Sequence, residues 1–292
     1  MSNFAKLNTN NLKMKQIKTL MVAALTLVMG VMMTSCLNSD GGESLYDGYI
    51  LAKVVYAGGL YGGATLQDAG GNTYQASAAS VAKLEANGFS FTDVDMAFVF
   101  YKFSVDENGD KITPPDYNAT EPQTFQVELV RIQKAPTEYA ERVESAEVLE
   151  TNKYETAPIA ISDFVGSSSS NTVKFDFYGN EPMLYMYLQW LLTNGEDEFK
   201  KHHIRLVYAF DEITADSNEL RFYLCHDKGD DDGKTAYIQS WYCFNIQKAL
   251  EAFESETGAK PTKIKLSLYE DPSFTGTMPT NRTDYTIDNN ND

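Results

Sequence analysis

The chain has 292 residues, with 41 acidic against 24 basic side chains, so its formal net charge is −17 at pH 7. This acidity excludes nucleic acid and anionic lipid headgroups as electrostatic partners. A net charge far from zero also keeps a protein soluble. The length suits one large domain or two small ones.

The N-terminal segment has the pattern of a secretion signal. Thr19 to Met33 form an apolar run of 15 residues, and Lys13, Lys15 and Lys18 precede it. The run is shorter than the ~20 residues of a membrane-spanning helix. A positive start, a short apolar core and small residues at its end indicate a signal peptide. Met14 is a candidate start codon besides Met1.

The sequence Met-Thr-Ser-Cys at 33–36 stands where the A-x-A cleavage pattern is expected, and it resembles the bacterial lipoprotein box. The resemblance implies that residues 1–35 are removed and that Cys36 carries acyl chains. Several chains on one residue make an anchor, whereas one holds only marginally. Residues 36–45 are a flexible tether. Leu37, not an aspartate, favours the outer membrane, with its inner or outer face open. Ordinary signal-peptidase cleavage is the alternative.

Residues 46–134 predict a small β domain. Alternating patterns indicate strands at 47–57, 96–105 and 124–133, and a hairpin at 64–77 that turns at Gly70, Gly71 and Asn72. A short helix after Ser80, with Gly88 past its end, lies between them. Three strands, a helix and two strands is the order of an OB-fold-like barrel.

Residues 135–157 carry many charges, with Pro136 and Pro158 at their two ends, and we interpret them as a linker that can be partly helical. Residues 158–288 predict an antiparallel β-sandwich. Its strands are expected at 171–179, 182–192, 202–210, 219–227, 236–244 and 263–270, with 158–165 as a candidate seventh. One helix is expected after Asn245, with Ile246, Ala249, Leu250 and Phe253 on its buried face and Gly258 at its end. The fold class is therefore mainly β, in two domains.

Cys225 and Cys243 are the cysteines that remain after Cys36. If residues 219–227 and 236–244 form a hairpin centred near Asp231, Cys225 faces Tyr237 and Cys243 faces Glu219. The two sulfurs would then lie beyond the reach of a disulfide, whose Cα atoms are at most about 7 Å apart. We expect buried free thiols, unless the two strands belong to different sheets.

With these features the chain resembles the NigD-like lipoproteins of Bacteroides-type bacteria. The resemblance rests on the lipobox, on "DGYILAKVV" and on the long run from His202 to Ile246, with its H-x-I-x-L-V-Y and L-x-F-x-L-x-H patterns. It implies an OB-like domain followed by a β-sandwich, and a bacteriocin-immunity or accessory role. It implies no catalytic residues.

The chain has three histidines: His202, His203 and His226. The first two point to opposite faces of a strand, so they cannot both bind one metal there. His226 could join one of them, together with Asp227, but a zinc site needs three or four ligands. We therefore expect strand-end histidines and no metal.

No other motif predicts catalysis or a cofactor. The acidic loops 106–110 and 227–234 lack the spacing of a calcium loop, because an EF-hand pattern in the second would need an acid at Lys228. Asn108 and Gly109 indicate a hairpin instead. The serines of 165–171 lack the G-x-S-x-G pattern of a hydrolase. We expect a protein that is not an enzyme.

Aromatic side chains are the remaining candidates for binding. Tyr56, Tyr61 and Tyr74 lie among glycines, and Trp241 is expected on the outer face of a strand with Tyr185, Tyr187, Tyr223 and Tyr237. Aromatic rings can anchor a protein partner or stack on sugars. The alternative is that these tyrosines bind nothing and cover the outer face of a half-buried sheet. The leading hypothesis is a lipid-anchored module that binds a protein or peptide; the alternative is a surface glycan-binding lipoprotein.

Overall fold

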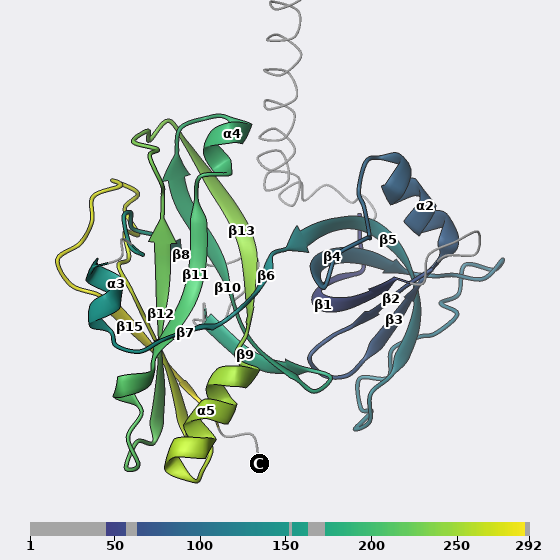
Figure 1. The fold of residues 1–292 in the computed structure, drawn as a ribbon. Coiled ribbons are helices and arrows are strands. Elements are labelled where there is room, and N and C mark those ends of the chain that lie inside the picture. The colour runs from purple at the N-terminus through teal and green to yellow at the C-terminus, as the bar shows by residue number, and fades with distance from the viewer. Residues whose placement is uncertain (1–44, 57–62, 152–153, 163–172, 290–292) are drawn as a thin grey trace, which may run out of the picture.

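The computed structural model describes residues 45–56, 63–151, 154–162 and 173–289. The signal segment, Cys36, the tether up to residue 44, Tyr61 and the serine-rich segment 165–171 lie outside the described residues. The fold is mainly β, as predicted, with a closed barrel followed by two facing sheets (Figure 1).

The first half is a five-stranded barrel with the order β1-β2-β3-β5-β4, in which β4 closes onto β1. Its only parallel pair is β3 with β5, and helix α2 connects β3 to β4. This is the element order predicted for an OB-like barrel. The elements are β1 (Gly48–Tyr56), β2 (Ala64–Gln67), β3 (Thr73–Ala76), α2 (Ala78–Ala86), β4 (Met96–Phe103) and β5 (Thr124–Ala135).

Local sequence explains the barrel's strands and turns. In β5, Phe125, Val127 and Leu129 are buried while the residues between them are exposed, which is the period of two expected of a half-buried strand. Gly71 adopts a φ of 80° in the turn between β2 and β3. The N-cap of helix α2 lies three residues before the predicted one, because the hydroxyl of Ser77, not of Ser80, accepts a free amide hydrogen of the first turn.

The second half contains two five-stranded sheets. The first has the order β6-β13-β10-β8, with β9 also paired to β10, and the second has the order β15-β14-β12-β11-β7. Inward-facing residues of both sheets form one large core, so the pair is a β-sandwich. The strands are β6 (Thr137–Tyr139), β7 (Glu141–Val143), β8 (Ala160–Ile161), β9 (Val173–Tyr178), β10 (Glu181–Leu192), β11 (His203–Ala209), β12 (Glu219–Asp227), β13 (Ala236–Asn245), β14 (Lys263–Leu268) and β15 (Thr283–Asp288).

Three details differ from the predictions. Residues 135–157 are not a free linker, because β6 and β7 lie there and pair in parallel with β13 and β11. Strands β12 and β13 are not a hairpin, because β12 pairs with β11 and β14 while β13 pairs with β10. The sheets are mixed, since β12 and β14 are also parallel. Short polar edge strands such as β15 carry too weak a pattern for the sequence to predict.

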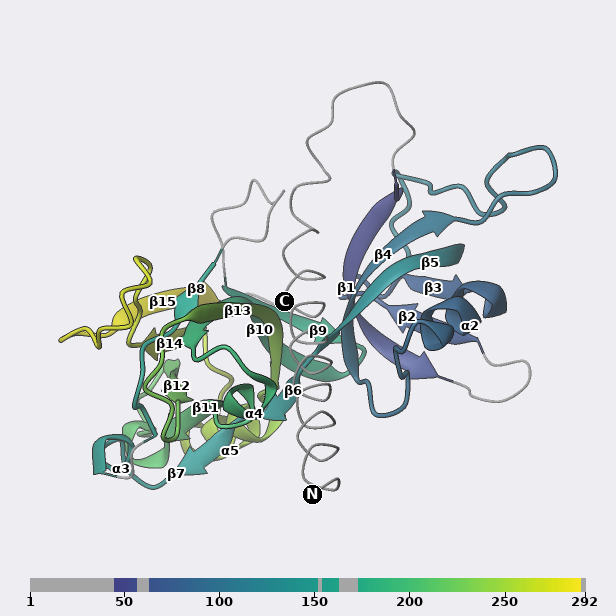
Figure 2. The same cartoon turned by 90° about the horizontal axis from the view of Figure 1, so that it is seen from above.

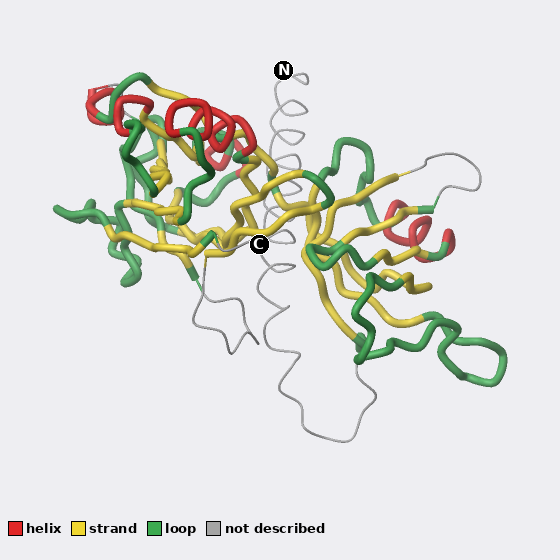
Figure 3. The backbone as a smooth tube through the Cα atoms, turned by 90° about the horizontal axis from the view of Figure 1, so that it is seen from below, coloured by secondary structure: helices red, strands yellow, loops and turns green. Residues whose placement is uncertain are grey.

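The second half contains α3 (Glu147–Thr151), within the segment interpreted as a partly helical linker, and α5 (Gln247–Thr257). It also contains two short helices that the sequence did not predict, α4 (Glu196–Phe199) and the 3-10 turn Phe210–Glu212. Figure 3 shows the helices of this half gathered along one side, apart from α2 on the barrel. Helix α5 is the predicted one: the side chain of Asn245 accepts from the amide of Gln247 at 3.0 Å, and Gly258 ends the helix in the left-handed conformation. Among the described residues, no helix is both long and apolar enough to span a bilayer.

The barrel packs against the outer face of the first sheet (Figure 2). The shared cluster joins Met96 and Ala135 of the barrel to Met183, Tyr185 and Cys243 of the sandwich. Phe98 stacks on Trp241 with ring centroids 5.6 Å apart, and Lys53 forms an ion pair with Glu181 at the border. We call this the apolar join. It buries the side of β10 that carries the odd-numbered residues. The sequence pattern predicted that this side would face solvent.

Candidate functional site

The most concentrated polar cluster inside the described structure consists of His202, His226 and Asp231. Its residue His202 follows α4 closely in the chain, and α4 lies at the end of the sandwich opposite α5 (Figure 1). His202 directly precedes β11, His226 is the next-to-last residue of β12, and Asp231 lies in the loop between β12 and β13. The side chains of His202 and Asp231 are 1% and 2% exposed, and His226 is 2% exposed. We call these three residues the His–Asp cluster.

The His–Asp cluster forms a continuous chain of hydrogen bonds. Nδ1 of His226 lies 3.0 Å from the carbonyl oxygen of Pro158, and its Nε2 lies 2.8 Å from Nδ1 of His202. Nε2 of His202 lies 3.0 Å from Oδ2 of Asp231. The chain therefore connects the segment before β8, the two strands β11 and β12, and the β12–β13 loop.

Asp231 also holds the residue that follows β10. The amide and hydroxyl of Thr193 donate to its two oxygens at 2.7 and 2.5 Å, and the amide of Gly233 donates to Oδ1 at 2.8 Å. Burial alone would raise the pKa of the Asp231 carboxyl, but the hydrogen bonds from Thr193, Gly233 and His202 outweigh it and hold the pKa well below its usual range. Asp231 is therefore ionised in the folded protein.

His226 has the opposite character. Burial lowers its pKa to about 4, although the hydrogen bond to Pro158 acts to raise it, and the neighbouring His202 lowers it further. The ring edge of Trp190 packs against His226 from the core side, with centroids 6.2 Å apart. His226 is thus a neutral imidazole near pH 7.

A small pocket lies beside the cluster. Its volume is about 50 Å³, and its walls come from the segment before β8, the end of β10, and the loops that follow β12 and β14. Lys228 and Lys234 line it, but Lys228 Nζ binds Asp232 and Lys234 Nζ donates to the carbonyls of Thr275 and Gly276. Ligand pockets that bury a drug-sized molecule are about 300–1,000 Å³, so this one has room for little more than water.

The structure brings together two of the predicted histidines and separates the third. His203, the first residue of β11, is exposed. Asp227 does not join the cluster: it accepts from the hydroxyl of Thr156 and the amide of Gly229. Asp231 takes the place predicted for Asp227. Within the described part of the chain, no three His, Cys, Asp or Glu side chains are placed to hold a metal ion.

The two acidic loops are turns held by their own aspartates. Asp106 accepts from the amides of Asn108 and Asp110 at 2.8 and 3.0 Å, and Gly109 has a φ of 88°. This is the predicted hairpin turn. In the loop 227–234, Asp227 and Asp231 point inward, so their oxygens are used by protein donors.

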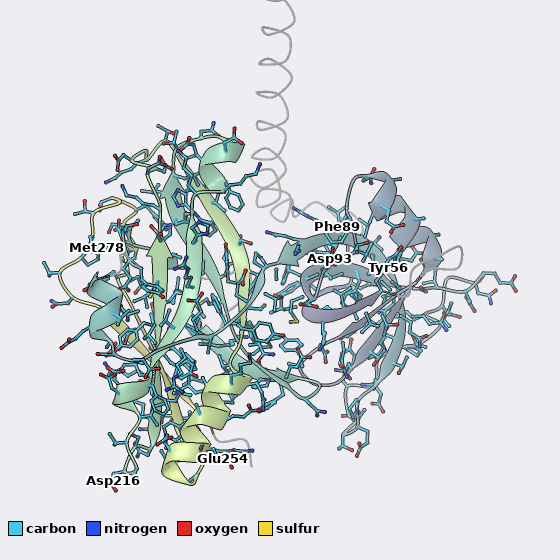
Figure 4. All side chains as sticks on the ribbon, viewed as in Figure 1. Tyr56, Phe89, Asp93, Asp216, Glu254 and Met278 are labelled. Carbon is cyan, nitrogen blue, oxygen red and sulfur yellow. The ribbon has the colours of Figure 1, made fainter. Side chains whose placement is uncertain are left out.

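The candidate aromatic residues do not lie together. Tyr74 is inside the barrel, where its hydroxyl donates to Asp68. Tyr56 lies on the barrel beside α2, donates to Glu85 and stacks on Phe91 (Figure 4). Trp241 is half-buried in the apolar join. Tyr185 and Tyr187 lie on the outer face as expected, but there they are buried against the barrel side, while Tyr237 stays exposed.

The two thiols are free and buried, as predicted, although the reason given by the hairpin was wrong. Cys243 lies in the apolar join, whereas Cys225 lies on the outer face of the other sheet with Leu149 of α3. Burial raises the pKa of both thiols. Each cysteine lies on the outer face of its own sheet, so both sheets stand between the two sulfurs.

The comparison with known proteins identifies relatives by fold. No family model and no curated protein matches the sequence. A predicted lipoprotein from Bacteroides fragilis has a similar structure, with a TM-score of 0.59, 17% identity, and coverage of 82% of this chain and 96% of its own. The two chains thus share a fold in which a barrel is followed by a sandwich.

Two further structures share the arrangement. A NigD-like immunity protein from Bacteroides caccae matches with a TM-score of 0.50 and 12% identity, covering 83% of this chain and 97% of its own. A predicted toxin-related protein from Parabacteroides distasonis matches with a TM-score of 0.50 and 13% identity, covering 82% and 91%. The structural neighbours therefore include a NigD-like protein, as the resemblance implied. At these identities, what is shared is the fold.

Proposed function

We propose that the chain is a lipid-anchored protein of the outer membrane that binds a protein or peptide partner and catalyses no reaction. The lipobox with Cys36 supports the anchor. One structural neighbour is described as a predicted lipoprotein and another as a NigD-like immunity protein, which supports an envelope role of this kind.

One observation carries the non-catalytic part of the proposal. All four ring nitrogens of His202 and His226 and both carboxylate oxygens of Asp231 are engaged by protein groups. A general base or nucleophile needs an atom within reach of a substrate. This cluster instead ties loops together, and its neighbouring pocket is too small for a substrate.

The barrel offers a surface for a partner. The segment between β4 and β5 projects from the barrel and exposes Val105, Ile112 and Tyr117, of which Tyr117 is 90% exposed. The segment is ordered by the turn at Asp106 and by two hydrogen bonds between Gln123 and Asp116. An ordered loop loses little conformational entropy on binding, and tyrosine is enriched at the energetic centres of interfaces.

Two experiments test this proposal. Mass analysis of the protein from its native host should find Cys36 acylated and residues 1–35 absent, and Cys36→Ser should release the protein from the membrane fraction. A photo-crosslinking residue at Tyr117 should capture one defined envelope protein in intact cells. The matched control is the same residue at Asp216, which is exposed at the end of the sandwich where α5 lies (Figure 4). Equal capture from both positions, or an unmodified Cys36, contradicts the proposal.

Glycan binding is the second candidate, and a row of aromatic rings favours it. Tyr46, Phe100, Tyr49 and Phe98 lie on the barrel's outer face with centroid distances of 4.8 to 6.0 Å, and the row continues to Trp241. Tyr49 is 40% exposed. Binding of the full chain to a glycan array, lost in Tyr49→Ala and retained in Tyr117→Ala, would favour this candidate over the first.

A further inference from the structure

The His–Asp cluster has an acceptor at each end. The carbonyl oxygen of Pro158 has no hydrogen to donate, so Nδ1 of His226 must carry one. The ionised Asp231 has none either, so Nε2 of His202 must carry one. The directions of the two outer hydrogen bonds are therefore fixed.

The central hydrogen bond needs a hydrogen of its own. Nδ1 of His202 and Nε2 of His226 are 2.8 Å apart, a distance that requires a hydrogen between the two nitrogens. The three hydrogen bonds thus need three hydrogens, and two neutral imidazoles supply two. This count does not depend on which tautomer each ring adopts.

The additional hydrogen has one favourable location. Asp231 already accepts from three backbone and hydroxyl donors besides His202, so a protonated carboxyl would have to give up one of them. His226 is buried among apolar groups that disfavour its charge, and its pKa is lowered to about 4. His202 is the ring next to the carboxylate, where a positive charge is stabilised.

We propose that His202 is a buried imidazolium that donates to both Asp231 and His226, and that this extra proton locks the β12–β13 loop onto the end of the sandwich. Loss of the proton removes one of the three hydrogen bonds and leaves two nitrogen lone pairs facing each other, or one facing a carboxylate. The lock is then weaker at high pH. Because it concerns this loop, the inference is independent of the partner or the anchor proposed above.

The surrounding charges leave Asp231 as the direct counter-ion. Asp227 and Lys228 follow His226 in the chain and act on its pKa in opposite directions. Asp230, next to Asp231, is paired with Lys201, which precedes His202. Lys201 also binds Glu198 of α4, and Lys228 binds Asp232. Asp227 accepts from neutral donors, the hydroxyl of Thr156 and the amide of Gly229, and each of the other side chains has its own opposite charge.

The first test is histidine NMR on the full wild-type chain. The sequence has only three histidines, so the ring ¹⁵N signals are few, and His203→Gln identifies the exposed one. At pH 7.5, above the ordinary histidine pKa of about 6.5, one buried ring should show two N–H groups and the other should be a neutral Nδ1–H tautomer. Two neutral buried rings at this pH would overturn the proposal, and this test needs no variant that could fail to fold.

The second test is the pH dependence of unfolding. If the folded state holds one proton that the unfolded state has lost, the ratio of folded to unfolded protein falls as the pH rises above about 6.5, by up to tenfold per pH unit. Asp231→Asn removes this slope, because an amide can donate to Nε2 of His202 and supply the third hydrogen without a charge. His203→Gln keeps the slope. A wild-type stability that is constant from pH 6.5 to 8.5 contradicts the proposal, as does an unchanged slope in Asp231→Asn.

Discussion

Two groups of contacts, the apolar join and the His–Asp cluster, connect parts of this molecule by different kinds of interaction. The apolar join holds the barrel against the first sheet through Met96, Met183 and Cys243, which are at most 1% exposed. The His–Asp cluster holds loops at the far end of the sandwich through charges and hydrogen bonds. The stability of the apolar join depends on buried area, whereas the stability of the His–Asp cluster depends on which of its nitrogen and oxygen atoms carry protons.

This difference decides how each join can fail. Apolar burial contributes in proportion to area and is insensitive to pH. A buried charge pair contributes little net stability, because desolvation offsets the attraction, but removing one partner is costly since the other stays buried and unpaired. The apolar join should therefore weaken gradually with truncation, whereas the polar one should fail with a single atom or proton.

The largest effect is expected from Asp231→Ala. It leaves the His202 ring and the donors of Thr193 and Gly233 without an acceptor. We expect the free energy of unfolding to fall by about 3–5 kcal/mol, as for other broken buried pairs. Denaturant titration at pH 7 measures it. A loss below about 1 kcal/mol would show that the cluster relaxes or admits water.

Met183→Ala tests the apolar join. Met183 is 1% exposed, and truncation of a buried methionine costs about 2–5 kcal/mol, including the cavity left behind. The loss should be the same at pH 5 and pH 7.5, in contrast to changes in the His–Asp cluster. Val55→Ala, at a position 59% exposed on the same barrel, is the control and should change stability by less than about 0.5 kcal/mol. A pH-dependent loss in Met183→Ala would contradict the distinction between the joins.

Acid should weaken the His–Asp cluster by protonating His226. Its pKa is about 4 in the folded protein and about 6.5 when unfolded, so the unfolded state binds more protons between these values. The contribution of His226 to stability is therefore complete above pH 6.5 and is lost as the pH falls to 4, by about 3 kcal/mol in total. His226→Gln should flatten this part of the curve. An NMR titration that finds His226 charged at pH 6 would contradict the expectation.

The two buried thiols report on the joins separately. Both have raised pKa values and should resist a thiol reagent in the native protein. In a Cys36→Ser background, Met183→Ala should speed the labelling of Cys243 by about tenfold for each 1.4 kcal/mol lost locally. Labelling of Cys225, which lies under α3, should change less. Equal acceleration of both thiols would mean that the molecule opens as one unit.

Sequence patterns were sufficient for the barrel because each of its strands carries its own alternation. Phe125, Val127 and Leu129 of β5 predict both the strand and its buried face. The Gly71 and Gly109 turns are equally local signals. The strand order can be predicted as well, because three strands, one helix and two strands is the element order of an OB-like barrel, whose strand order is known.

Non-local pairing was beyond the sequence patterns. Strands β12 and β13 are consecutive and separated by a turn-like loop, which predicts a hairpin, yet each pairs within a different sheet. The same loop brings Asp231 to His202, whereas local spacing favoured Asp227. Asp231 stands among three consecutive aspartates, and only the fold decides which one turns inward.

The smallest loss of stability is expected from a change at Asp232, the residue next to Asp231. Asp232 neighbours Asp231 and binds Lys228, but its side chain is 93% exposed. Exposed ion pairs contribute about 0–1 kcal/mol, and salt screens them. Asp232→Asn should therefore lower stability by no more than about 0.5 kcal/mol, and the loss should vanish in 0.5 M salt, whereas the loss in Asp231→Asn should persist. Both variants remove one negative charge from the same loop, so a similar loss in the two would mean that the loop's charge, and not the buried hydrogen-bond chain, holds this end of the sandwich.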